Sequence, residues 1–162
     1  MNRPVVDMAP ERVLVTPAAG VEQGRLDDFA RMAQSAGHEI LTVPGLSLQL
    51  PQASVHFRSL PTHEVKAVQA NLARADEWFA ELGTVAVVVN SKNGRYGEPW
   101  YVDPFAVGVL GLAWMHGRRG YVSGELPRDR AGGTNREIAY LLATYGVTAL
   151  DGTLNFRRQP SS

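Results

Sequence analysis

The stretch Thr84-Val-Ala-Val-Val-Val-Asn90 is an unbroken run of small and β-branched apolar residues between two polar ones. A strand with one face in water alternates apolar and polar residues, whereas this run is apolar at every inner position. The run therefore predicts the central strand of a parallel sheet that is covered on both faces.

Strand and helix patterns alternate on both sides of this run. Short apolar stretches predict four more strands, at 12–16, 39–43, 120–124 and 147–150. Apolar spacings of three and four, with capping residues, predict helices at 21–36, 61–82, 103–116 and from Thr134 to Gly146. We therefore expect an α/β fold: a single-domain doubly wound, flavodoxin- or Rossmann-like five-stranded parallel sheet with helices on both faces. The domain is expected to span 11–155, between a flexible N-terminal arm (1–10) and a C-terminal tail (156–162).

The composition of the chain excludes several classes of function. Its 162 residues carry sixteen basic and sixteen acidic side chains and no cysteine. Balanced charge gives no electrostatic footprint for nucleic acid or anionic membranes, and the absence of cysteine removes disulfides and thiolate chemistry. The first ten residues lack the apolar core of a signal peptide, and the run Phe105–Met115 falls short of the ~20 residues of a membrane span. We expect a cytoplasmic protein with neither nucleic acid nor membrane as a partner.

The helix predicted over 103–116 is apolar on every side. Such a helix is either enclosed in the core or packed against another subunit. We expect a homo-oligomer with this helix near the interface.

In open parallel sheets, ligands bind beyond the carboxyl ends of the strands. Four predicted loops meet at that edge, namely Thr16–Gly20, Asn90–Asp103, Gly124–Thr134 and Asp151–Asn155. The third loop runs into Gly132-Gly-Thr-Asn-Arg-Glu137, where two glycines precede a helix. Free N–H groups and the helix dipole make such a start a seat for phosphate or carboxylate. Glu137 lies in the first turn of this helix, and two roles remain open for it. It is either a reactive group or a helix cap, because Thr134 and Glu137 also have the spacing of a capping box.

Three segments resemble the nucleoside 2-deoxyribosyltransferase-like family. They are Gly37-His-Glu-Ile-Leu-Thr-Val-Pro44, then Ala73-Arg-Ala-Asp-Glu77 followed by the strand to Asn90 and Gly94-Arg-Tyr-Gly97, and Gly133-Thr-Asn-Arg-Glu-Ile-Ala-Tyr140. The resemblance implies cleavage or transfer of the N-glycosidic bond of a nucleoside or nucleoside 5′-monophosphate, with Glu137 as nucleophile. The sequence also departs from the family, in which the glutamate motif directly follows the central strand. Here residues 103–124 intervene, and Val109 stands where the glutamate would fall.

The chemistry of such a reaction assigns roles to other residues near this edge. An acid must protonate the departing base, and Asp103 or Asp129 can do so, although Asp103 is also a helix cap. The expected substrate-binding residues are a strand-end amide, two aromatic rings for the base, and a helix start for a hydroxyl or phosphate: Asn90, Tyr96, Trp100, Gly133 and Thr134. No cofactor or metal is expected, and His38, His56, His63 and His116 are expected to be surface groups.

Two other functions remain open. The same predicted strand pattern and the Asn90–Gly97 loop also resemble flavodoxin-like, FMN-dependent NAD(P)H oxidoreductases. However, Thr16-Pro-Ala-Ala-Gly20 lacks the hydroxyl and basic residues that such enzymes use to hold the FMN phosphate. The third possibility is a non-catalytic nucleotide sensor on the same fold.

Overall fold

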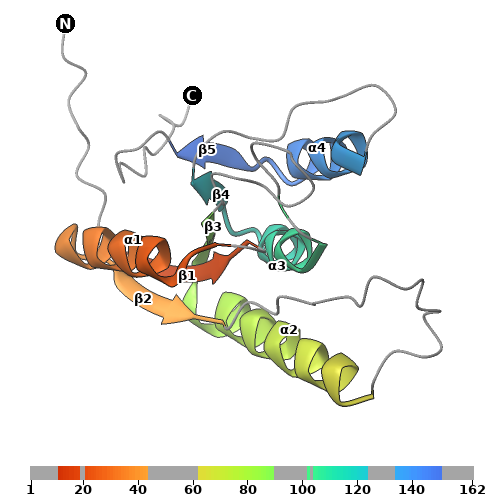
Figure 1. The fold of residues 1–162 in the computed structure, drawn as a ribbon, viewed down its shortest axis with the longest axis horizontal. Coiled ribbons are helices and arrows are strands. Elements are labelled where there is room, and N and C mark those ends of the chain that lie inside the picture. Colours follow the sequence, from red (N-terminus) through yellow and green to blue (C-terminus); the bar gives the residue numbers. More distant parts are fainter. Residues whose placement is uncertain are drawn as a thin grey trace, which may run out of the picture.

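Five parallel strands and four helices alternate in the described part of the chain (Figure 1). The computed structural model describes residues 11–18, 21–43, 62–89, 102, 104–123 and 134–150. The elements are β1 (Arg12–Pro17), α1 (Gln23–Ser35), β2 (Glu39–Thr42), α2 (Thr62–Leu82), β3 (Val85–Val89), α3 (Pro104–Met115), β4 (Gly120–Ser123), α4 (Thr134–Thr144) and β5 (Thr148–Leu150). The strand order is β2-β1-β3-β4-β5, and every pairing is parallel. This confirms the predicted fold class, in the strand order of flavodoxin.

Strand β3 occupies the centre of the sheet, as its apolar run predicts. Its five residues are all buried, and they pair with β1 on one side and β4 on the other. Alternate residues point to opposite faces. Ala86 and Val88 belong to one core cluster, whereas Val85, Val87 and Val89 belong to a second. Both faces of the strand are therefore buried, which is why no polar residue interrupts it.

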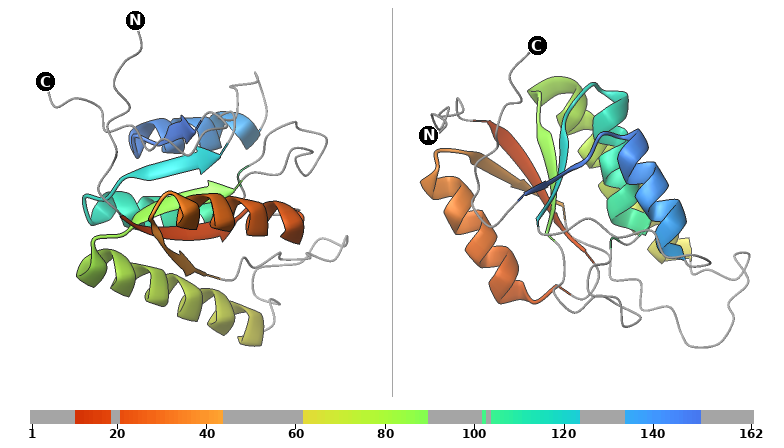
Figure 2. Two further views of the ribbon diagram at one scale, coloured as in Figure 1. Left: turned by 90° about the vertical axis from the view of Figure 1, so that its left-hand side faces the viewer. Right: turned by 90° about the horizontal axis from the view of Figure 1, so that it is seen from above.

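The helices form two unequal layers. Figure 2 shows α1 on one face of the sheet and α2, α3 and α4 on the other. The larger core cluster lies under the three helices and includes Phe79, Leu110 and Leu142. The smaller cluster lies under α1, where Leu26 and Phe29 pack against it.

Helix α3 lies in the middle of the larger helix layer, and this position explains its composition. It contacts α2, α4, β3 and β4. Its described side chains are buried or partly buried until the last two residues, where Trp114 is 47% exposed and Met115 is 73% exposed. The chain's own packing therefore accounts for an apolar surface on nearly every side. A homo-oligomer that uses this helix stays a prediction.

Each turn from a helix to the next strand contains a glycine with a positive φ angle. These glycines are Gly37 (90°), Gly83 (62°), Gly117 (68°) and Gly146 (64°). A left-handed residue just past a helix end allows the chain to reverse within a few residues, and glycine adopts this conformation without steric strain. The predicted helix ends at Gly37 and Gly146 are thus confirmed. All four turns lie at the amino edge of the sheet, where the strands begin.

The prediction that His38 is a surface group is wrong. His38 is only 6% exposed, and its Nδ1 accepts a hydrogen bond from the backbone N–H of Glu11 at 3.2 Å. The short turn after α1 brings the residue before β2 against the residue before β1, which encloses the imidazole. His63 is exposed, and His116 is partly exposed with its Nε2 2.7 Å from Oδ1 of Asp76. His56 lies outside the described residues.

Candidate functional site

The carboxyl edge of the sheet is the candidate site. Strand β1 continues into α1 on one face, while β3 continues toward α3 on the opposite face (Figures 1 and 2). The adjacent strands β1 and β3 therefore form the switch point, above which doubly wound proteins bind their ligands. The N-terminal ends of α1, α3 and α4 lie at this same edge, because each helix follows a parallel strand.

The structure describes part of the predicted site. Thr134 is the first residue of α4, and Glu137 lies in the first turn of that helix. The other five predicted site residues lie outside the described residues: Asn90, Tyr96, Trp100, Asp103 and Gly133. The same holds for Asp129, the other acid considered for protonating the base. Glu137 is therefore the predicted site residue whose side chain can be placed.

The Glu137 carboxylate is exposed and unpaired. It makes no hydrogen bond or ion pair with any described residue. The bond from its carboxylate back to the helix start, which defines a capping box, is thus not formed in the described part of the chain. An exposed carboxylate without a partner among the described residues is available to a ligand.

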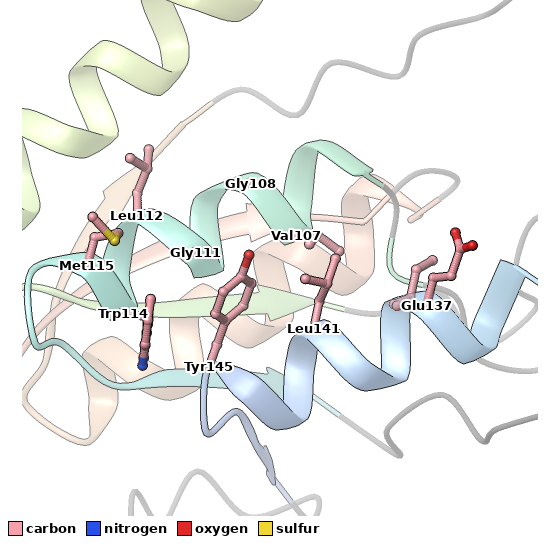
Figure 3. A pocket seen from close by; sticks show the side chains of 10 residues that line it. Val107, Gly108, Gly111, Leu112, Trp114, Met115, Glu137, Leu141 and Tyr145 are labelled. Atoms are coloured by element: carbon pink, nitrogen blue, oxygen red, sulfur yellow. The ribbon is translucent and has the colours of Figure 1, made fainter.

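Glu137 also stands at one end of an apolar groove between α3 and α4 (Figure 3). The groove has a volume of about 590 Å³. Its other end is aromatic, where the rings of Trp114 and Tyr145 lie 5.6 Å apart. Besides Glu137, it is lined by glycines and apolar side chains of α3 and α4 and by the residue just after α4: Val107, Gly108, Gly111, Leu112, Trp114, Met115, Ile138, Leu141 and Tyr145.

Gly111 of α3 lies where Tyr145, the residue just after α4, approaches that helix. A Cβ atom on Gly111 would lie 3.1 Å from the Tyr145 hydroxyl oxygen. The phenol ring of Tyr145 is therefore seated directly on the backbone of α3. Among the described lining residues Glu137 is the one with a charged side chain, so this part of the groove offers a nonpolar surface with a carboxylate at its end.

Sequence reasoning missed one polar residue at the carboxyl edge. Thr16 was expected at the boundary between a strand and a loop, but it lies inside β1, opposite Val88 of β3, and is completely buried. Its hydroxyl has no hydrogen-bond partner in the part of the chain that the structure describes. The only signal in the sequence is a hydroxyl residue at the end of an apolar run, which is also common in ordinary strands.

Searches for other kinds of site in the described chain give two negative results. No group of three or more His, Cys, Asp or Glu side chains there is placed to hold a metal ion. None of the helices in these ranges combines the length and apolarity needed to cross a membrane.

Neither a protein-family model nor a curated protein matches this sequence.

Proposed function

We propose that the protein cleaves or transfers the N-glycosidic bond of a nucleoside or nucleoside 5′-monophosphate, with Glu137 as nucleophile. The observation that carries the proposal is the unpaired Glu137 carboxylate at the carboxyl edge of a doubly wound sheet. The segment around it, residues 133–140, is also the one that resembles the glutamate motif of the nucleoside 2-deoxyribosyltransferase-like family.

The chemistry requires few groups. A carboxylate oxygen of Glu137 forms a bond to the anomeric carbon of the sugar as the bond from that carbon to the base nitrogen breaks. The base departs with the bonding electron pair and takes a proton from an acid, for which Asp103 is the candidate. Water or a second base then displaces the glutamate from the glycosyl ester, which restores the carboxylate.

The test compares three variants with the wild-type protein. Glu137→Gln keeps the shape of the side chain but removes the nucleophilic carboxylate, so release of free base should fall by several orders of magnitude. Its melting temperature should equal that of the wild type, because Glu137 has no partner among the described residues. Glu137→Ala should behave in the same way. Glu81→Gln removes an equally exposed charge from α2 at the opposite edge, so this control should leave activity unchanged.

Base release is measured by chromatography over a panel of nucleosides, 2′-deoxynucleosides and their 5′-monophosphates, and the glycosyl ester is sought by mass spectrometry. Undiminished base release by folded Glu137→Gln contradicts the assignment of the nucleophile. A wild-type protein that is inactive on the whole panel contradicts the proposed function.

The strand order also favours a second candidate, an FMN-dependent oxidoreductase, because flavodoxin has this order and binds FMN at the β1/β3 switch point. One hydrogen bond and one charged residue after β1 count against it. The N–H of Ala18 donates to the carbonyl oxygen of Val89 at 2.9 Å, so it is not available to a phosphate. Glu22 is the N-cap residue of α1, so its negative charge lies where the FMN phosphate would approach. Purification of the protein as a yellow complex with the absorbance of flavin would favour this candidate.

A further inference from the structure

Three polar side chains are buried in the described chain, and two of them are satisfied. His38 accepts the N–H of Glu11 at 3.2 Å, and the Thr84 hydroxyl donates to the carbonyl of Trp78 at 3.4 Å. Both lie at the amino edge, just before β2 and β3. The third, Thr16, is 0% exposed at the carboxyl edge, and its Oγ1 has no partner among the described residues. The other buried side-chain atom without a partner, Oε2 of Glu11, belongs to a carboxylate whose Oε1 accepts from Arg119.

An unpaired buried hydroxyl destabilises the native state and calls for an explanation. Valine has nearly the same shape as threonine and suits a strand equally well. The sequence already has valine opposite Thr16, at Val88, and immediately before it, at Val15. Packing therefore gives no reason for a hydroxyl at this position.

The position of Thr16 supplies such a reason. Side chains alternate along a strand, so Thr16 faces the same side of β1 as Leu14, which belongs to the core cluster under α2 and α3. Thr16 is the next-to-last residue of β1 and pairs with the next-to-last residue of β3. These are the two strands of the switch point. The hydroxyl thus lies at the inner end of the region in which this fold class binds ligands.

We propose that the Thr16 hydroxyl is a ligand-binding group, which hydrogen-bonds a polar atom of the nucleoside or nucleotide held above β1 and β3. Its missing partner in the free protein is then supplied by the ligand. This inference rests on the proposed function for the identity of the ligand, but it concerns β1 and not Glu137. It predicts that one substitution changes stability and binding in opposite directions.

The experiment measures the melting temperature and the dissociation constant of wild-type protein, Thr16→Val, Thr16→Ser and Thr84→Val. The probes are 2′-deoxynucleosides, nucleoside 5′-monophosphates and FMN. Thr16→Val should raise the melting temperature of the free protein, because it removes an unpaired buried hydroxyl. It should weaken binding about tenfold or more, because the ligand loses its hydrogen-bond partner. Thr16→Ser keeps the hydroxyl and should bind within a few-fold of wild type.

Thr84→Val is the matched control at the opposite edge. It should lower the melting temperature slightly, because it removes a hydrogen bond, and leave binding unchanged. Wild-type affinity in Thr16→Val overturns the inference while the proposed function stands. A lower melting temperature in Thr16→Val also overturns it, because the hydroxyl then serves the fold. Loss of FMN binding in Thr16→Val, with no nucleoside or nucleoside monophosphate bound by wild type, supports the role of Thr16 and contradicts the proposed function. A wild-type protein that binds none of the probes overturns both.

Discussion

The two edges of the sheet are built differently. At the amino edge, the connections from helix to strand are short, at 36–38, 83–84, 116–119 and 145–147. At the carboxyl edge, the connections from strand to helix are 18–22, 43–61, 90–103 and 124–133. Short turns leave little freedom to the chain, whereas longer connections are where α/β proteins place their ligand-binding residues.

The polar groups of the two edges differ in the same way. The amino edge is connected by hydrogen bonds over long sequence separations, from Arg119 to Glu11 at 2.9 Å, from Arg12 to Glu39 at 2.8 Å, and from Arg118 to the carbonyl of Phe79 at 3.1 Å. Two polar groups at the carboxyl edge, Thr16 and Glu137, have no partner among the described residues. The amino edge thus carries hydrogen bonds that stabilise the fold, whereas these two groups are the ones that we propose to contact a ligand.

Removal of a partly buried hydrogen bond at the amino edge should have the largest effect on stability. His38→Leu removes the acceptor of the Glu11 N–H and leaves that donor unpaired, so it should lower the free energy of unfolding by about 1–3 kcal/mol. His38→Asn can place its Oδ1 near the position of Nδ1 and should recover part of the loss. Urea unfolding measures both. Equal stability of His38→Leu and wild type would show that the amino edge does not depend on this bond.

The same substitution at two glycines should have opposite effects at the two edges. Gly146 ends α4 with a φ of 64°, and a Cβ atom there would meet no atom within 4 Å. Gly146→Ala should therefore lower stability by about 1 kcal/mol through backbone strain alone. Gly24 lies in the first turn of α1, has no positive φ, and also has open space around it. Gly24→Ala should raise stability by about 0.5–1 kcal/mol through helix propensity.

Thermal melts of the two glycine variants give the sign of each effect directly. If the stability of both variants changed in the same direction, the positive φ angle of Gly146 would not be what determines the effect of alanine at the amino edge.

The sequence predicts the fold well because local patterns determine most of it. The apolar run of β3, the helical periodicities, and the glycines at 37 and 146 each specify an element or its end without distant contacts. The environment of α3 is different, because its apolar surface fits both a core and an interface. Only the strand order, which places α3 between α2 and α4, shows that the chain itself covers most of it.

The site was less predictable, because the properties of its residues depend on contacts between distant parts of the chain. The position of Glu137 in the first turn of α4 follows from a local motif, and the structure places it there. The burial of His38 depends on Glu11, 27 residues away, and the unpaired state of Thr16 depends on what surrounds it on neighbouring strands. Neither property leaves a trace in the local sequence.

The smallest expected effect concerns the titration of Tyr121 on β4. The phenol is 4% exposed, and burial raises its pKa above the usual 10.0, because the charged phenolate is disfavoured there. The Arg119 guanidinium opposes this rise through its charge and a hydrogen bond, whereas Glu11 adds to it. Since the pKa is higher in the folded than in the unfolded state, the associated stability is present below pH ~10 and is lost as the pH rises through the folded pKa.

Two measurements test this sign. In a titration of tyrosinate absorbance, a tyrosine that ionises above pH ~10 in the folded protein should disappear in Tyr121→Phe. The stability of wild type should fall more steeply above pH ~10 than that of Tyr121→Phe. Arg119→Met should raise the pKa of Tyr121 further, because it removes the opposing charge and hydrogen bond. Ionisation of Tyr121 at its ordinary pKa of 10.0 would mean that water reaches the phenol, and that this part of the amino edge is less tightly closed than its burial indicates.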